Sequence, residues 1–225
     1  MTCVVGFSDG NTIIFGADSA AAGGGPETSA AGEIYTPAEP KVFPCGAYLL
    51  GVCGSYRVAQ VLRHRAELPE MPAATEDLER FLVRDLLPAL AATIEAAAIA
   101  GTRPGYLGDR VAILLGIRGR LWTVCSDLTL LPESGFGALG SGRHRAYGAL
   151  YALDAAGVEG PRRRLEIALE AAAAYTSDVR PPWHFVSSED KAIQWPTATA
   201  PASGASASFF PGRSRSQADE LRRAV

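Results

Sequence analysis

The second residue of the chain, Thr2, is a candidate nucleophile, because a small hydroxyl residue stands directly behind the initiator Met1. A threonine hydroxyl reacts poorly unless a base lies beside it, and a free N-terminal amino group, with a pKa of about 8, is such a base. Aminopeptidases remove an initiator methionine when the next residue is small, so processing would put nucleophile and base on one residue. Alternatively, Thr2 merely begins a β-strand, a position that suits β-branched residues.

The N-terminal part of the chain has the pattern of paired strands. The runs 3–7 and 11–15 are rich in β-forming residues and flank an Asp-Gly step, which is a strong hairpin signal. A second strand pair is predicted over 41–43 and 47–53. Residues 21–40, between the pairs, are rich in Gly, Pro and Ser and lack a periodic apolar face, which predicts a loop.

Helices alternate with further strands in the rest of the chain. Apolar residues recur at helical intervals in four segments, and a hairpin with its turn at Arg118-Gly119 separates the second segment from the third. Pro161 suits the first turn of the last helix. The predicted helices cover residues 55–67, 76–100, 140–157 and 161 onward, and short strands follow within 183–188 and 191–195.

This order of elements predicts the fold class. Strands, two helices, strands, two helices and strands do not alternate as in a parallel α/β fold, so we expect an α+β protein with antiparallel sheets stacked between helical layers. We expect one domain over residues 1–195. Residues 196–225 are rich in Pro, Ala and Ser without a periodic apolar face, which predicts a largely disordered tail.

The composition argues against several classes of partner. A hydrophobic fraction of 48% in 225 residues is ample for a core, and a net charge of -3 without long Lys/Arg runs argues against nucleic acid and membrane surfaces. No apolar run is long enough to span a membrane and no basic segment precedes a secretory signal, so we expect a cytoplasmic protein. The four cysteines lie among apolar residues without a C-x-x-C pair, which favours reduced core residues over a metal site.

One glycine-rich segment, residues 135–140, matches the G-x-G-x-x-G pattern of dinucleotide-binding proteins and has Asp154 downstream. A Rossmann site needs a strand that runs into the glycines and another strand after the helix. Here Pro132-Glu133-Ser134 precede the glycines and a second helix follows, so we expect no nucleotide cofactor.

Five short motifs together give the sequence a resemblance to a known family. They are Thr2 before an apolar hairpin, "GADSA" with Asp18, Lys41 at the start of the next strand, "GVCGSYR", and "GALGSGRHRAYGAL" with Ser141. With helix pairs in the intervals, the chain resembles the proteasome β-subunit and HslV family of N-terminal threonine hydrolases, from Thr2 to about Ser188. The resemblance implies a four-layer αββα sandwich.

The resemblance also implies roles for three residues. Thr2 Oγ would attack a peptide carbonyl while the freed amino group takes the hydroxyl proton. Lys41 would lower the pKa of that hydroxyl, and Asp18 would pair with the buried ammonium. Outside this family pattern, Asp18 would be an ordinary turn carboxylate and Lys41 a solvated strand-end lysine.

Two more positions match the family pattern. Gly54 corresponds to the glycine whose N–H forms the oxyanion hole, although Ser55 replaces the second glycine that usually follows. Ser141 would help to relay the proton of the amino group, or it would cap a helix, and both roles can hold together.

The match is partial near the end of the fourth helix. The family has an aspartate and, three residues later, a serine around the nucleophile, where this chain has Ala173 and Thr176. Thr176 could replace the serine hydroxyl, and Asp178 could supply the carboxylate from one turn further on.

An apolar pocket beside the nucleophile is also implied by the resemblance. The family mapping places Ala21, Phe43 and Val52 in its lining, which predicts cleavage after apolar residues.

The preferred hypothesis is a cytoplasmic threonine peptidase subunit without metal or organic cofactor. It would cut polypeptides inside homo-oligomeric rings that an ATP-dependent unfoldase could feed, and it would bind neither nucleic acid nor membrane. Two alternatives stay open: an amidase of the same fold that acts on a small amide, and a catalytically silent ring or scaffold subunit. Ala173 favours the silent subunit, and retention of Met1 would support it.

Overall fold

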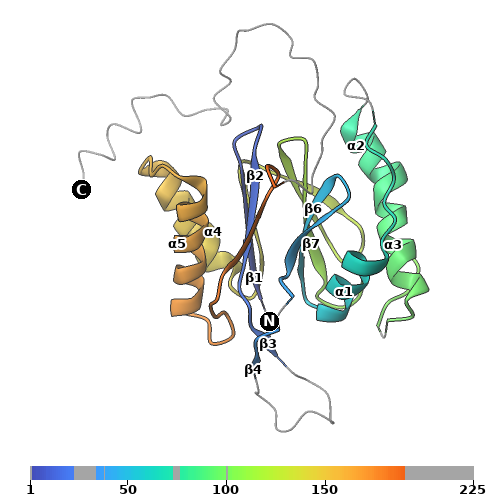
Figure 1. The fold of residues 1–225 in the computed structure, drawn as a ribbon, viewed down its shortest axis with the longest axis horizontal. Helices are drawn as coiled ribbons and strands as arrows, with labels where there is room; N and C mark the ends of the chain where they lie inside the picture. Colours follow the sequence, from blue (N-terminus) through green and yellow to red (C-terminus); the bar gives the residue numbers. More distant parts are fainter. Residues whose placement is uncertain (1, 23–33, 38, 73–76, 100, 191–225) are drawn as a thin grey trace, which may run out of the picture.

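Two antiparallel sheets lie face to face between two layers of helices in the computed structural model (Figure 1). The structure describes residues 2–22, 34–37, 39–72, 77–99 and 101–190. The layers follow the predicted order of helices, sheet, sheet and helices, so the α+β sandwich is confirmed.

The first sheet carries Thr2 at the start of a central strand. It consists of β1 (Cys3–Ser8), β2 (Ile13–Ala17), β10 (Phe136–Gly140) and β11 (His184–Ser187), in the order β10-β1-β2-β11. The predicted N-terminal hairpin and the strand within 183–188 are therefore confirmed. The antiparallel register pairs Cys3 with Gly140, so Thr2 lies level with Ser141.

The β1–β2 turn is held by its own side chain. Asp9 Oδ1 accepts the backbone N–H groups of Asn11 and Thr12, both at 2.8 Å. Such an Asx turn explains why the Asp-Gly step marks a hairpin in the sequence.

The second sheet packs against the first. It consists of β5 (Val42–Cys45), β6 (Tyr48–Cys53), β7 (Ala112–Ile117), β8 (Arg120–Val124) and β9 (Leu130–Glu133), in that order. Arg118 and Gly119 have φ of 47° and 68°, the positive values that a two-residue type I′ turn requires. The predicted strand pair and the predicted β7–β8 hairpin are confirmed.

Strands β9 and β10 were not predicted from the sequence. β9 contains Pro132, which disguises a strand, but β9 is the edge of its sheet and an edge tolerates proline. The G-x-G-x-x-G segment forms β10, which pairs with β1 along its length, and no helix begins within the glycines. This arrangement differs from a dinucleotide-binding turn.

Helices cover both outer faces of the sandwich. α4 (Arg143–Ala155) and α5 (Pro161–Ala174) cover the first sheet, and α1 (Tyr56–Arg65), α2 (Leu78–Phe81), η1 (Leu82–Leu86) and α3 (Leu87–Ala96) cover the second (Figure 1). The predicted helix over 76–100 therefore contains a π-helical turn. Pro88 has no N–H to donate to the carbonyl of Arg84, which favours a wider turn there. No helix in the described part of the chain has the length and apolar character needed to cross a membrane.

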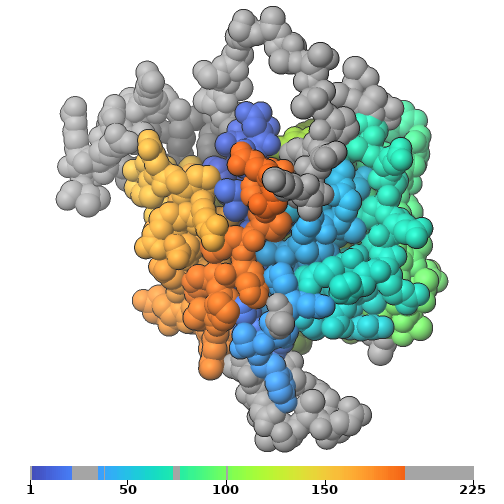
Figure 2. All heavy atoms as spheres, in the orientation of Figure 1, coloured from blue at the N-terminus to red at the C-terminus, as the bar shows by residue number. Residues whose placement is uncertain are grey.

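Apolar side chains fill the three spaces between the layers. Val4, Phe15 and Leu114 are fully buried between the sheets, while outer clusters lie under each helical layer. Figure 2 shows β11, in orange, beside the lighter blue segment that contains β5, where the edges of the two sheets meet. The packing fixes the two sheets against each other, and with them the residues at the start of β1.

The predicted loop over 21–40 needs a correction. Ala21–Ala22 (β3) pairs with Ile34–Tyr35 (β4), so the base of this segment is a short antiparallel hairpin. Alanine-rich sequence carries little strand signal, which is why the pair was missed. The predicted strand at 191–195 and the predicted tail at 196–225 lie outside the described residues.

The cysteines are free thiols, as the sequence suggested. Cys3, Cys45 and Cys53 are buried and Cys125 is half-buried. Among the described residues, no cluster of three or more His, Cys, Asp or Glu side chains is arranged to hold a metal ion.

Candidate active site

A chain of hydrogen bonds starts at the backbone nitrogen of Thr2, a residue that is 6% exposed. This N–H donates to Ser141 Oγ at 3.3 Å. Ser141 Oγ also lies 3.3 Å from the carbonyl oxygen of Thr2 and 3.3 Å from Asp178 Oδ2, so its proton can go to either acceptor. Ser177 Oγ donates to the other carboxylate oxygen at 2.6 Å. The nitrogen of Thr2 is thus connected through one hydroxyl to the buried Asp178.

Asp18, at the end of β2, is fully buried and joins three segments. Its Oδ1 accepts the backbone N–H of Cys3 at 2.9 Å and Lys41 Nζ at 2.7 Å. Its Oδ2 accepts the N–H of Ala20 at 3.0 Å. A buried carboxylate is tolerable when donors surround it in this way, so Asp18 fixes the start of β1 relative to Lys41.

Lys41 precedes β5 and is 5% exposed. Besides the ion pair with Asp18, its ammonium donates to the carbonyl oxygen of Ala20 at 2.5 Å. Burial lowers the pKa of Lys41 from its ordinary value, and the neighbouring Asp18 carboxylate opposes that shift. An ammonium shielded from water exerts a strong field on its neighbours, so Lys41 can stabilise negative charge that develops beside it.

Cys3 follows Thr2 but does not compete with it as a nucleophile. Burial, reinforced by the Asp18 carboxylate, raises the pKa of the Cys3 thiol to about 12. The thiolate is the reactive form of cysteine, so Cys3 stays inert at neutral pH.

Two glycines with positive φ allow the backbone to close around Thr2. Gly54 has φ of 92°, and a Cβ there would lie 2.2 Å from the carbonyl oxygen of Arg110. Gly140 has φ of 91°, and a Cβ there would lie 2.0 Å from the carbonyl oxygen of Thr2. Both positions therefore require glycine.

Thr2 lies between two hollows that share Gly54. The smaller has a volume of about 60 Å³, and its lining combines the polar side chains of Thr2, Lys41, Ser55 and Tyr56 with small apolar residues: Ala20, Ala21, Val52, Gly54 and Ala59. The larger, of about 510 Å³, contains Ser141 and two arginines, Arg110 and Arg143. Thr2 thus lines both hollows.

Solved structures of other proteins share this fold. The BPH protein of Thiobacillus denitrificans, solved in complex with epoxomicin, has 20% sequence identity and a TM-score of 0.63, over 83% of this chain and 97% of that one. HslV from Trypanosoma brucei has 15% identity and a TM-score of 0.54, over 83% of this chain and 98% of that one. The chain has the HslV-like, proteasome-type fold. Anbu from Pseudomonas aeruginosa, solved as a helical assembly, shares the fold at 12% identity and a TM-score of 0.55, over 83% and 80% of the two chains.

At the level of sequence, no protein-family profile and no curated protein matches the chain. The likeness is therefore one of fold, and the chemistry has to be argued from the residues themselves.

Within this HslV-like fold, most of the residues that the sequence singled out lie together. The structure brings six of them to the start of β1: Thr2, Asp18, Lys41, Gly54, Ser141 and Asp178. Ala21 and Val52 line the smaller hollow, where the sequence predicted an apolar pocket.

Phe43 and Thr176 line neither hollow beside Thr2. The Phe43 ring belongs to the core under α1, with the guanidinium of Arg63 4.4 Å from its centre, and it is not among the residues that line the smaller hollow. Thr176 Oγ1 is buried and has no hydrogen-bond partner among the described residues, whereas Asp178 contacts Ser141 directly.

Some residues of the site escaped sequence reasoning. The carbonyl of Ala20 holds Lys41, but a backbone acceptor leaves no signal in residue type. Arg143 follows the Gly-Ser-Gly motif directly and could have been noted, whereas Arg110 is far from every motif in the sequence.

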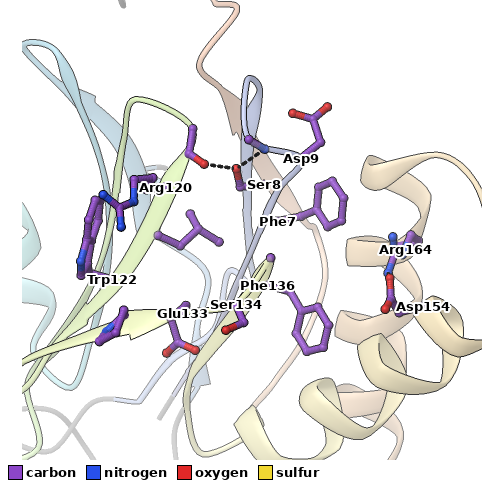
Figure 3. A pocket seen from close by; sticks show the side chains of 15 residues that line it. Phe7, Ser8, Asp9, Arg120, Trp122, Glu133, Ser134, Phe136, Asp154 and Arg164 are labelled. Atoms are coloured by element: carbon purple, nitrogen blue, oxygen red, sulfur yellow. Dashed lines mark hydrogen bonds and ion pairs between the residues drawn. The ribbon is translucent and has the colours of Figure 1, made fainter. Parts of the chain in front are cut away.

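A third hollow lies at the opposite end of β1 from Thr2 and has a volume of about 330 Å³. Figure 3 shows Arg120 and Trp122 on one side of it, and Phe7 and Phe136 on the other, near Arg164. It is separate from the candidate active site.

Proposed function

We propose that the chain is a threonine-type peptidase in which Thr2 is both nucleophile and base once Met1 has been removed. The observation that carries this proposal is the hydrogen-bonded connection from the nitrogen of Thr2 through Ser141 to Asp178, together with a buried lysine that lines the smaller hollow with Thr2. The nitrogen that would become the amino group contacts a hydroxyl that is itself bonded to a carboxylate, an arrangement suited to passing on a proton.

The reaction follows from these positions. The amino group of Thr2 takes the proton of Oγ as Oγ bonds to the carbonyl carbon of the substrate, and the N–H of Gly54 donates to the oxygen that becomes negative. The C–N bond then breaks, and the amino group gives its proton to the leaving nitrogen. Water hydrolyses the resulting ester with the same amino group as base, which restores the Thr2 hydroxyl.

Lys41 and Asp18 prepare the nucleophile. The buried ammonium favours the alkoxide-like character of Oγ, and Asp18 keeps the ammonium in place by the 2.7 Å ion pair. Lys41 therefore acts by charge and does not need to transfer a proton.

Asp178 is proposed as a positioning residue. It accepts from Ser141 Oγ and thereby orients the hydroxyl that contacts the nitrogen of Thr2. A carboxylate beyond the end of α5 would in this way replace the aspartate that the family pattern places where this chain has Ala173.

The smaller hollow points to the acyl side of the substrate. Its volume of about 60 Å³ corresponds to roughly two water molecules, which suits a side chain the size of alanine or valine. We therefore propose polypeptide substrates that are cut after small apolar residues.

Assembly and location are part of the same proposal. The neighbours in fold are HslV-like proteins, one of them solved as a helical assembly, which supports self-association of this chain. A cytoplasmic ring that encloses the sites would keep an unguarded nucleophile away from other proteins, and an ATP-dependent unfoldase could supply it with substrates.

The test compares Thr2→Ala with Thr2→Ser, because both residues are small enough for Met1 removal and only serine keeps a hydroxyl. A fluorogenic peptide with alanine before the scissile bond should be hydrolysed by the wild type and by Thr2→Ser, and not by Thr2→Ala. Light scattering should give the same assembly for all three. Epoxomicin, the compound bound to the Thiobacillus protein, should bind the wild type and not Thr2→Ala. Equal turnover by Thr2→Ala would refute the proposal.

A further inference from the structure

The larger hollow beside Thr2 has a basic lining without an acidic counterpart. Arg110 and Arg143 both line it, and the described residues around it include no Asp or Glu. The remaining lining is apolar or contributes small polar groups, such as Ser126 and the half-buried Cys125. Any ligand in this hollow therefore meets a positive field that nothing in its wall neutralises.

Chemistry decides which end of a substrate enters this hollow. The leaving nitrogen must receive a proton from the amino group of Thr2, and the nitrogen of Thr2 donates to Ser141 Oγ. Ser141 lines the larger hollow and not the smaller one, whereas Lys41 lines the smaller one. The part of the substrate on the leaving-group side accordingly lies beside the two arginines.

The two guanidinium groups are available to a ligand. Both residues are exposed, and neither forms an ion pair with a carboxylate in the described part of the chain. Arg143 Nη1 makes one long hydrogen bond of 3.4 Å to the carbonyl of Gly140. The carboxylate of Asp109, next to Arg110 in sequence, accepts the hydroxyl of Tyr106 at 2.7 Å.

The backbone of Arg110 is also unusual. Its φ is 61°, a value that bulky residues seldom adopt. The carbonyl oxygen of Arg110 lies 2.2 Å from the position that a Cβ would take at Gly54. The segment that presents this guanidinium is thus packed directly against the proposed oxyanion glycine, and residues in such conformations are frequent at functional sites.

From this arrangement we infer that the enzyme selects polypeptides with an acidic residue, Asp or Glu, directly after the scissile bond. The inference rests on the proposed function and adds the substrate class on the leaving-group side. A carboxylate there would accept from the forked N–H groups of Arg110 and Arg143, and such charge-assisted bonds add both affinity and orientation.

The test uses two quenched fluorescent peptides that differ by one residue, Glu or Gln, after the scissile bond. Glutamine has nearly the same shape without the charge. We expect kcat/KM to be about five- to tenfold higher for the Glu peptide, with the difference shrinking as salt is raised. Arg110→Gln and Arg143→Gln should each reduce the Glu/Gln ratio, and the double variant should bring it close to one.

Arg145→Gln is the matched control. Arg145 is an exposed arginine on the first turns of α4, and it does not line the hollow. The Glu/Gln ratio of this variant should equal that of the wild type. A wild-type ratio of one or less, or a ratio unchanged in the double variant, would overturn the inference.

A binding measurement separates this inference from the proposed function. Calorimetry with Thr2→Ala and the same two peptides should show tighter binding of the Glu peptide, dependent on Arg110 and Arg143. Tighter Glu binding without any Thr2-dependent hydrolysis in the wild type would refute the peptidase and keep the acid-selective hollow. Hydrolysis that depends on Thr2 but shows no preference for Glu would support the peptidase and refute the acid-selective hollow.

Discussion

Two ion pairs lie at opposite ends of the sandwich and differ in their burial and in their hydrogen bonds to the surrounding protein. Beside Thr2, the side chains of Lys41 and Asp18 are 7% and 0% exposed, and both also form hydrogen bonds with backbone groups. At the third hollow, Arg164 and Asp154 also lie 2.7 Å apart, but their side chains are 9% and 39% exposed (Figure 3). Arg164 Nε is buried and has no hydrogen-bond partner among the described residues.

The difference shows what each pair is built to do. Asp18 connects β1, the end of β2 and the residue before β5, so breaking that pair would leave a charge without water or partner. The Arg164–Asp154 pair connects α5 to α4, with the guanidinium 4.9 Å from the ring centre of Phe7. Water reaches Asp154, so this pair holds two helices together without organising a reactive group.

The largest effect is expected for Lys41→Ala. Turnover of fluorogenic peptides should fall by at least about 100-fold, because a preorganised charge beside the nucleophile is lost. The variant should also lose about 3–5 kcal/mol of unfolding free energy in urea titrations, since Asp18 stays buried and unpaired.

Lys41→Arg is the informative partner of that variant. A planar guanidinium cannot occupy the place of a compact ammonium that contacts both Asp18 and the carbonyl of Ala20. Turnover should therefore stay low, and near-normal turnover in Lys41→Arg would contradict the geometry proposed for this pair.

A smaller loss is expected for Ser141→Ala. Without the hydroxyl that contacts the nitrogen of Thr2, kcat should fall by on the order of 10²-fold while KM changes little. Asp178→Asn should act in the same direction with a smaller effect, because asparagine still accepts from Ser141. Steady-state kinetics with one peptide measure both, and a change confined to KM would argue against a relay.

The pH dependence of activity should reflect two groups, the amino group of Thr2 and the ammonium of Lys41. Activity should rise as the amino group of Thr2 loses its proton near pH 8, roughly the value of a free α-amino group. As the pH rises further, activity should fall again before the pH reaches the ordinary pKa of lysine. Burial lowers the pKa of Lys41, so its charge is lost at a lower pH than that of an exposed lysine. Circular dichroism controls for unfolding, and activity that stays constant through the ordinary pKa range of lysine would contradict the proposal that the charge of Lys41 assists the reaction.

The smallest effect is expected at the far end of the sandwich, for Asp154→Asn. Asp154 is partly solvated and the asparagine oxygen still accepts from Arg164, so the variant should lose about 1 kcal/mol of stability or less and keep its peptide turnover. Thermal melting and the fluorogenic assay check this. A large loss of activity would mean that the two ends of the molecule are coupled.

Much of this arrangement was predictable because local patterns dictate it. Asp9-Gly10 defines the first hairpin, and the resemblance to the proteasome β-subunit family predicted that Asp18, Lys41 and Ser141 lie near Thr2 although they are far apart in sequence. Strand β9 escaped prediction because Pro132 is tolerated at a sheet edge. β10 escaped because its glycines pack against β1 without a β-propensity signal.

The rest of the site depends on tertiary contacts that residue types do not reveal. The acceptor of Lys41 at Ala20 is a backbone oxygen, and Arg110 reaches the site because its carbonyl packs against Gly54. Phe43 shows the converse, since this apolar residue is only two positions from Lys41 in sequence but lies in the core under α1.

The intact mass of a preparation that hydrolyses peptides tests the central claim most directly. The account predicts that every active molecule lacks one methionine residue, because the base is the freed amino group of Thr2. Hydrolysis that depends on Thr2 by a protein that retains Met1 in full would contradict it, since that nitrogen would then be an amide without basicity.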